Sequence, residues 1–103
     1  MFNLNELCVI AYENATKREA KDGKVSTNTR LMLKHTATEV VEAAEAYNSW
    51  VDNVANKEIF ASELADIICC VLIIAGKEDI DIENALADCM EKNYKRVIKK
   101  GDK

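Results

Sequence analysis

No proline interrupts the 103 residues of this chain, and its three glycines stand singly. Proline and glycine are the residues that disfavour helix interiors most, so a chain with so few of them favours long helices joined by short connections. The composition is 49% apolar and 31% charged, a balance typical of folded globular proteins. We therefore expect an all-α protein, with a single domain over residues 1–103 and a core within about residues 4–99.

Apolar residues recur at spacings of three and four in four segments, at about residues 5–21, 29–50, 58–75 and 81–99. Gly23 is expected to end the first helix, the polar stretch STNT (26–29) to cap the second, and Asp81 to cap the fourth. The third segment is apolar on all sides beyond Asp66, which is typical of a central or interfacial helix. These features predict a four-helix bundle with antiparallel central helices, assembled as an oligomer.

Charge and cysteine usage restrict the class of partner and the compartment. A formal net charge of −4 argues against nucleic acid or an anionic membrane surface as the main partner. The first ten residues lack the basic region of a signal peptide, and the apolar run from Ile67 to Ala75 is too short to span a bilayer. Cys69 and Cys70 are adjacent, no C-x-x-C pair occurs, and there is one histidine. A zinc site is therefore disfavoured, and we expect a cytoplasmic protein with reduced, buried cysteines and no membrane partner.

Two acidic pairs mark the central helices. Glu39 and Glu42 form E-x-x-E on the second helix, and Glu63 and Asp66 form E-x-x-D on the third. Residues three apart lie on the same side of a helix. If the two helices form an antiparallel hairpin, Glu42 is level with Glu63 and Glu39 is level with Asp66, so the four carboxylates are expected to converge.

Converging carboxylates in a groove of low dielectric either take up protons or bind a cation. A set of anionic oxygen ligands suits a hard divalent ion, so the sequence predicts a Mg²⁺ site, with Mn²⁺ as a second possibility. A single E-x-x-E pair is most often ordinary helix surface. The second pair, the matched register and the apolar flank ADIICCVLIIA favour a site.

These motifs resemble the MazG-like branch of the all-α nucleoside triphosphate pyrophosphohydrolases, which includes dCTPase-type and dimeric dUTPase-type enzymes. The resemblance rests on EVVEAAEAY, ELADIICCVL and KNYKR and covers about residues 31–96. It implies hydrolysis of a nucleoside triphosphate to a monophosphate and pyrophosphate, with Glu39, Glu42, Glu63 and Asp66 as the catalytic metal ligands. It further implies a homodimer or a dimer of dimers. The phosphate-facing residues that it implies on the fourth helix are Lys92, Asn93 and Arg96.

Several alternatives remain open from the sequence. Phosphoribosyl-ATP pyrophosphohydrolases of the same superfamily usually carry a histidine after the second acidic motif, and ELADIICCVL has none. A non-catalytic helical interaction module that retains the fold is a second alternative. The basic residues of the fourth helix also fit the ordinary preference for cations near a helix C-terminus.

Three further residues near the acidic motifs have no assigned role. His35 lies one turn before Glu39, where a packed or hydrogen-bonded imidazole is the simpler interpretation. Glu45 suits ordinary surface as well as a supporting position beside the ligands. Trp50 either stacks on a nucleobase or closes the end of the core.

Overall fold

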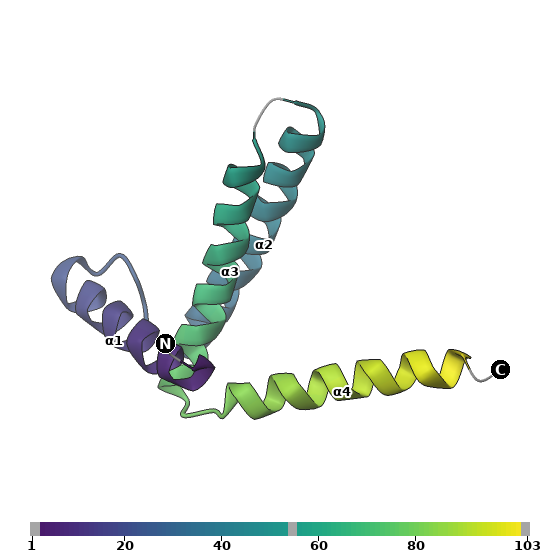
Figure 1. The fold of residues 1–103 in the computed structure, drawn as a ribbon. Coiled ribbons are helices and arrows are strands. Elements are labelled where there is room, and N and C mark those ends of the chain that lie inside the picture. Colours follow the sequence, from purple (N-terminus) through teal and green to yellow (C-terminus); the bar gives the residue numbers. More distant parts are fainter. Residues whose placement is uncertain (1–2, 54–55, 102–103) are drawn as a thin grey trace.

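The computed structural model describes residues 3–53 and 56–101, and every regular element in these ranges is a helix (Figure 1). The helix boundaries lie within about two residues of the expected ones. The four helices are α1 (Leu4–Asp22), α2 (Thr29–Val51), α3 (Lys57–Lys77) and α4 (Ile82–Gly101). The all-α prediction is confirmed.

Side-chain caps fix where the helices begin. Asn3, Asn28 and Asn56 each accept a hydrogen bond from the backbone N–H three residues ahead, at 2.8–3.1 Å. Asp81 caps α4 in the same way through Asn84 N–H at 3.1 Å. Each cap satisfies a backbone donor that would otherwise have no partner in the first turn. At the other end of α1, Gly23 takes the left-handed conformation (φ 67°), as the sequence predicted.

Helices α2 and α3 form the antiparallel hairpin that the acidic register assumed (Figure 1). The turn between them includes residues 54–55, which lie outside the described residues. Three aromatic rings close this end of the hairpin: Tyr47 and Phe60 lie 5.4 Å apart, and Trp50 lies 5.9 Å from Phe60. Trp50 therefore occupies the end of the core, the second of its two expected roles.

Helix α1 packs against the C-terminal half of α3, and Gly76 permits the close approach. A Cβ at this position would collide with the carbonyl oxygen of Cys8 and would lie 2.9 Å from Tyr12 Cβ. Glycine is therefore required here by the contact between helices, since its backbone conformation is an ordinary helical one.

Helix α4 does not pack along the hairpin but extends away from it as an arm (Figure 1). Its base is held by Asn5, whose side chain donates to Asp81 at 2.9 Å and accepts from Glu83 N–H at 3.2 Å. Within a single chain, three helices thus pack together and the fourth is left largely exposed, including Met90, Tyr94 and Val97.

The described residues form a small core made of small side chains. Its buried apolar members are Cys8, Ala15, Met32, Ala43, Cys70 and Ala75. The accessible surface is 7933 Å², whereas a compact monomer of this mass exposes about 5,800 Å². The radius of gyration of 16.7 Å likewise exceeds the roughly 13 Å typical of a compact domain of this length. A single chain therefore leaves apolar surface that a compact fold would bury.

Helix α3 presents two different faces to two different cavities. One face lines a cavity that also has basic and acidic walls, which we call the polar cavity, through Asp66, Cys69, Cys70 and Ile73. The opposite face lines an apolar groove of about 400 Å³ between α3, α4 and the start of α1, through Ile67, Ile68, Val71 and Leu72. This double role explains why the helix is apolar on all sides.

The length argument against a membrane span is corrected by the structure. The apolar run is part of a 21-residue helix, Lys57–Lys77, which is long and apolar enough by composition to cross a bilayer. One such helix is weak evidence for a membrane protein, because the central helix of a helical bundle meets the same criteria. Every 18-residue window of α3 also contains Glu63 and Asp66, and carboxylates within a bilayer are costly.

Candidate functional site

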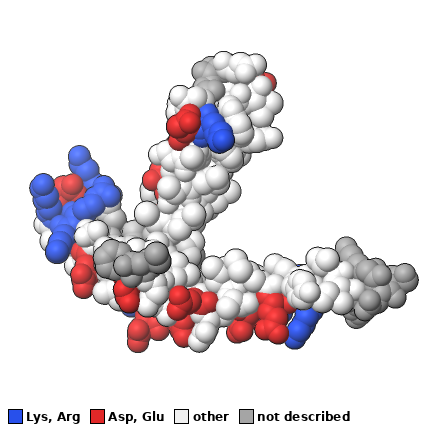
Figure 2. Space-filling model, in the orientation of Figure 1, with Lys and Arg blue, Asp and Glu red and all other residues white. Residues whose placement is uncertain are grey.

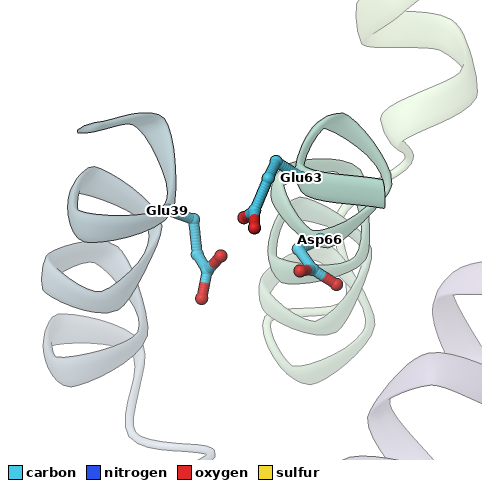
Figure 3. A group of neighbouring side chains, drawn as sticks. All are labelled: Glu39, Glu63 and Asp66. Atoms are coloured by element: carbon cyan, nitrogen blue, oxygen red, sulfur yellow. The ribbon is translucent and has the colours of Figure 1, made fainter. Parts of the chain in front are cut away.

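Three of the four predicted carboxylates meet between α2 and α3. One oxygen from each of Glu39, Glu63 and Asp66 lies within 4.8 Å of the other two, and we call these residues the carboxylate trio. Figure 3 shows Glu39 extending from α2 towards α3 and Glu63 extending back towards it. The hairpin register places the side chains level, and the three-residue spacing keeps Glu63 and Asp66 on one side of α3.

Burial within the carboxylate trio is uneven. Glu39 is 9% exposed, Glu63 is half-buried and Asp66 is exposed. Burial raises the pKa of Glu39 above its usual value, and the charge of Glu42 raises it further, as do those of Asp66 and Glu63. Among the described residues, His35 is the one group whose charge lowers this pKa. The site is therefore short of positive charge.

Two buried oxygens, Glu39 Oε2 and Glu63 Oε2, have no hydrogen-bond partner among the described residues. Buried polar atoms are normally paired, so these atoms indicate a missing cationic or hydrogen-bonding partner. Octahedral Mg²⁺, with oxygen ligands at about 2.0–2.1 Å, requires ligand oxygens roughly 3–4.2 Å apart. The observed spread of up to 4.8 Å is close to this range. The residues present therefore fit a hard divalent cation after small side-chain movements.

Glu42 lies outside the carboxylate trio, although the register places it level with Glu63. Its side chain is exposed, and its influence on the site is seen in the raised pKa of Glu39. Glu42 is rotated by about 60° from Glu39 around α2, as Asp66 is from Glu63 around α3, so spacing alone does not explain why Glu42 lies outside the trio. Glu45 is exposed as well.

His35 contacts a carboxylate of the trio. Its Nε2 lies 3.0 Å from Glu39 Oε1, one helical turn away on α2. This contact leaves Glu39 Oε2 as the oxygen without a partner among the described residues. The imidazole thus orients a carboxylate of the trio. Of the two cysteines that line the polar cavity nearby, Cys70 is buried and Cys69 is exposed.

The expectation that the cysteines are reduced agrees with the structure, in which all four are free. Their expected burial is only half right. Cys8 and Cys70 are buried, while Cys69 and Cys89 are exposed.

The polar cavity has a volume of about 320 Å³ and connects α2 and α3 with the end of α1. Glu39 and Asp66 line it from α2 and α3, and Arg18 and Lys24 line it from α1 and the loop that follows α1. Met32, Val25 and Ile73 complete its lining with apolar surface. A cavity of this size with opposed charges is suited to a small polyanionic molecule that carries a cation.

Lys92, Asn93 and Arg96 lie on the α4 arm, and all three are exposed. The polar cavity has none of them in its lining, and the main contacts of α4 within the described chain are with α1. Asn93 Nδ2 approaches Cys89 Sγ at 4.0 Å on the same helix. A single chain therefore does not bring these residues to the carboxylate trio.

Sequence reasoning did not identify Arg18 and Lys24 as candidate site residues. They belong to a run of cations at Lys17, Arg18, Lys21 and Lys24, near the end of α1, where cations are favoured by the helix dipole. Figure 2 shows Lys and Arg side chains gathered over this end of α1 and the loop that follows it. The signal is present in the sequence, but only the packing of α1 on α3 shows which of these cations face the acids.

The chain was compared with known protein families, curated proteins and solved structures. The profile of the MazG nucleotide pyrophosphohydrolase domain matches residues 27–99, which include α2, α3 and most of α4. No curated protein and no solved structure gives a significant match. The matched region contains the whole carboxylate trio and begins after Arg18 and Lys24.

Proposed function

We propose that this chain, which belongs to the MazG nucleotide pyrophosphohydrolase family, is a metal-dependent enzyme that hydrolyses a nucleoside triphosphate to a monophosphate and pyrophosphate. The observation that carries the proposal is the carboxylate trio, with two partnerless buried oxygens, beside a cavity that also has cationic walls. Housecleaning of nucleotide pools in the cytoplasm is the cellular role that we propose for it.

Glu39, Glu63 and Asp66 would hold Mg²⁺, or Mn²⁺, with Glu42 as a fourth ligand or as a proton acceptor. The bound ion would supply a Lewis acid that stabilises negative charge on the phosphate oxygens. The oxygen of an attacking water forms a bond to phosphorus at the α–β bridge while the bridging P–O bond breaks. A carboxylate accepts the water proton, and pyrophosphate leaves. Glu42 is the candidate acceptor because it is exposed and lies beside the trio.

The test of this function is turnover by purified protein on a panel of canonical and modified nucleoside triphosphates, with and without Mg²⁺. We expect pyrophosphate release that requires the ion. Glu63→Gln should lose nearly all turnover and keep the fold, because it removes one ligand charge without removing a packing contact. Glu45→Gln removes the same charge outside the trio and should retain the parental rate.

Turnover of Glu63→Gln at the parental rate would refute the assigned site. A parental protein that is folded and binds no nucleoside triphosphate would favour the non-catalytic helical module. Preference for phosphoribosyl-ATP within the panel would favour the enzyme of histidine synthesis.

The apolar groove and the α4 arm support a homodimer, or a dimer of dimers, as the working form. The groove is lined almost entirely by apolar side chains, and Ile68 on its wall is 57% exposed. On the arm, Met90 and Val97 are exposed by more than 60% and lie on one side of the helix. We propose a second copy as the occupant, since the accessible surface exceeds that of a compact monomer by about 2,100 Å² per chain, and twice this area lies within the range of about 2,000–5,000 Å² that obligate homodimers bury in total.

A dimer would also explain how residues of α4 could contact the substrate phosphates, as the family resemblance implies. An arm that crosses to a second copy would bring Lys92, Asn93 and Arg96 of one subunit towards the carboxylate trio of the other. Arg96→Ala is then expected to weaken substrate binding or turnover by about tenfold, the loss expected from one charge-assisted hydrogen bond. Mixing Arg96→Ala with Glu63→Gln subunits should restore part of the activity, because one site in the mixed dimer is intact.

Sedimentation at micromolar concentration tests the assembly. We expect a dimer or larger species for the parental protein and dissociation for Ile68→Glu, which places a charge in the apolar groove. Lys57→Glu changes an exposed residue of the same helix outside the groove and should leave the assembly intact. A well-folded 11.5 kDa monomer as the sole species would refute the proposal.

A further inference from the structure

We infer that Arg18 and Lys24 form the subsite for the pyrophosphate half of the substrate, within the same subunit as the carboxylate trio. The inference rests on the proposed function and extends it to residues outside the matched family region, which begins at residue 27. The juxtaposition that carries it is a single cavity lined by two cations, from α1 and the loop that follows it, and by Glu39 and Asp66, from α2 and α3.

Charge balance requires additional cations near the trio. A triphosphate carries about four negative charges at neutral pH, and the trio contributes up to three more when it is ionised. One divalent ion neutralises only part of this charge. Polyphosphates are commonly held by Arg and Lys, and a guanidinium can bind two phosphate oxygens at once. Arg18 and Lys24 are the only Arg and Lys residues that line the polar cavity among the described residues.

Among the described residues, the two cations do not pair with the acids that line the same cavity. The two ion pairs of the described structure are His35–Glu39 and Lys95–Glu91. A ligand in the polar cavity can therefore contact both the cations and the acids that line it.

Contacts of both kinds orient the substrate. Phosphate oxygens next to the scissile bond lie at the carboxylate trio, and the terminal phosphates extend across the cavity to Arg18 and Lys24. The nucleoside then lies towards the open side, away from the basic wall. A second, smaller cavity of about 170 Å³ shares Lys24, Val25, Met32 and His35 with the first, so Lys24 lines both cavities.

Calorimetric titration with inorganic pyrophosphate in the presence of Mg²⁺ tests the subsite without relying on turnover. The double variant Arg18→Ala/Lys24→Ala is expected to bind pyrophosphate at least tenfold more weakly than the parental protein. In steady-state assays, the same variant should raise KM for the triphosphate, and inhibition by added pyrophosphate should weaken in parallel. Both side chains are exposed, so the melting temperature should stay near the parental value.

The matched control is Lys17→Ala/Lys21→Ala, which removes two charges from the same end of α1 but from positions outside the cavity lining. It should bind pyrophosphate within about twofold of the parental protein. An equal loss in the control would show that only the general positive potential of α1 matters, and this outcome would overturn the inference. Rescue of binding by Arg18→Lys/Lys24→Arg would support direct contact by the two cations.

Failure of the inference and failure of the proposed function give different results. Parental hydrolysis together with unchanged pyrophosphate affinity in Arg18→Ala/Lys24→Ala overturns the inference and leaves the function standing. A parental protein that hydrolyses no nucleoside triphosphate, but whose pyrophosphate affinity still depends on Arg18 and Lys24, overturns the function and retains the anion subsite.

Discussion

Replacing Glu39 by Gln should stabilise the protein in the absence of divalent cations. The substitution keeps the shape of the side chain and removes one charge from the carboxylate trio. The carbonyl oxygen of the introduced amide can still accept from His35, and its NH₂ group can donate to the partnerless Oε2 of Glu63. A site built to hold a cation is expected to carry this kind of strain when no cation is bound.

The magnitude follows from the spacing of the carboxylates. Two unit charges 4.8 Å apart repel by about 3.5 kcal/mol at an effective dielectric constant of 20 and by about 0.9 kcal/mol in bulk water. Since Asp66 is exposed and Glu63 is half-buried, the water limit weighs heavily. We expect Glu39→Gln to raise the free energy of unfolding by about 1–2 kcal/mol, or about 4–8 °C in melting temperature for each kcal/mol.

Mg²⁺ should make the parental protein more stable than Glu39→Gln. At a free Mg²⁺ concentration 100 times its Kd, ligand binding adds about 2.7 kcal/mol to the stability of the parental protein. Glu39→Gln should gain much less, because it has lost a ligand oxygen with full charge. Thermal melts with EDTA and with a Mg²⁺ titration measure both effects, and Glu45→Gln is the control that loses the same charge elsewhere on α2. The reasoning is refuted if Glu39→Gln is less stable than the parental protein in EDTA and gains equally from Mg²⁺.

Two further predictions concern the positions of α1 and α4. Gly76→Ala should lower the melting temperature, because the new Cβ displaces α1 at a cost of about 1–3 kcal/mol, against a gain of about 1 kcal/mol in helix propensity. A melting temperature above the parental value would contradict this prediction. Hydrogen bonds from Asn5 and Asn84 hold the pKa of Asp81 below its usual value of 3.8. The ionised carboxylate therefore stabilises the fold above about pH 3.8, and this stabilisation is lost as the pH falls through the pKa of the folded state. Asp81→Asn should therefore melt below the parental protein at pH 7, and the difference should shrink below about pH 3.8; a difference independent of pH would contradict the assignment.

Local patterns were sufficient to predict the helices and the three residues of the trio. Apolar spacing and Asn or Asp caps depend on neighbouring residues only, and the hairpin register follows once two helices of known length are antiparallel. Glu42 shows the limit of that argument, since the same three-residue spacing brings Glu63 and Asp66 together in the trio but leaves Glu42 exposed outside it. Membership of the trio depends on how each helix is rotated about its own axis, which is set by packing and not by spacing.

The direction of α4 and the basic wall of the polar cavity could not be predicted in this way. An apolar stripe looks the same whether it packs on its own chain or on a second copy, so the stripe predicts a helix and not its neighbour. The placement of Arg18 depends on how closely α1 approaches α3, which Gly76 permits through a contact distant in the sequence. Long-range contacts of this kind leave no periodic signal near the residues that they position.

Helix α3 lines both the polar cavity and the apolar groove, so the proposed ligand binding and the proposed self-association would be reciprocal. A second copy bound in the apolar groove would also restrain the α3 backbone, whose other face carries Asp66 and Ile73 into the lining of the polar cavity. If association of two copies raises the affinity for the nucleotide by some factor, thermodynamic linkage requires that the nucleotide raises the affinity between the copies by the same factor. Activity per chain should accordingly fall on dilution, and substrate should shift the assembly equilibrium towards the larger species.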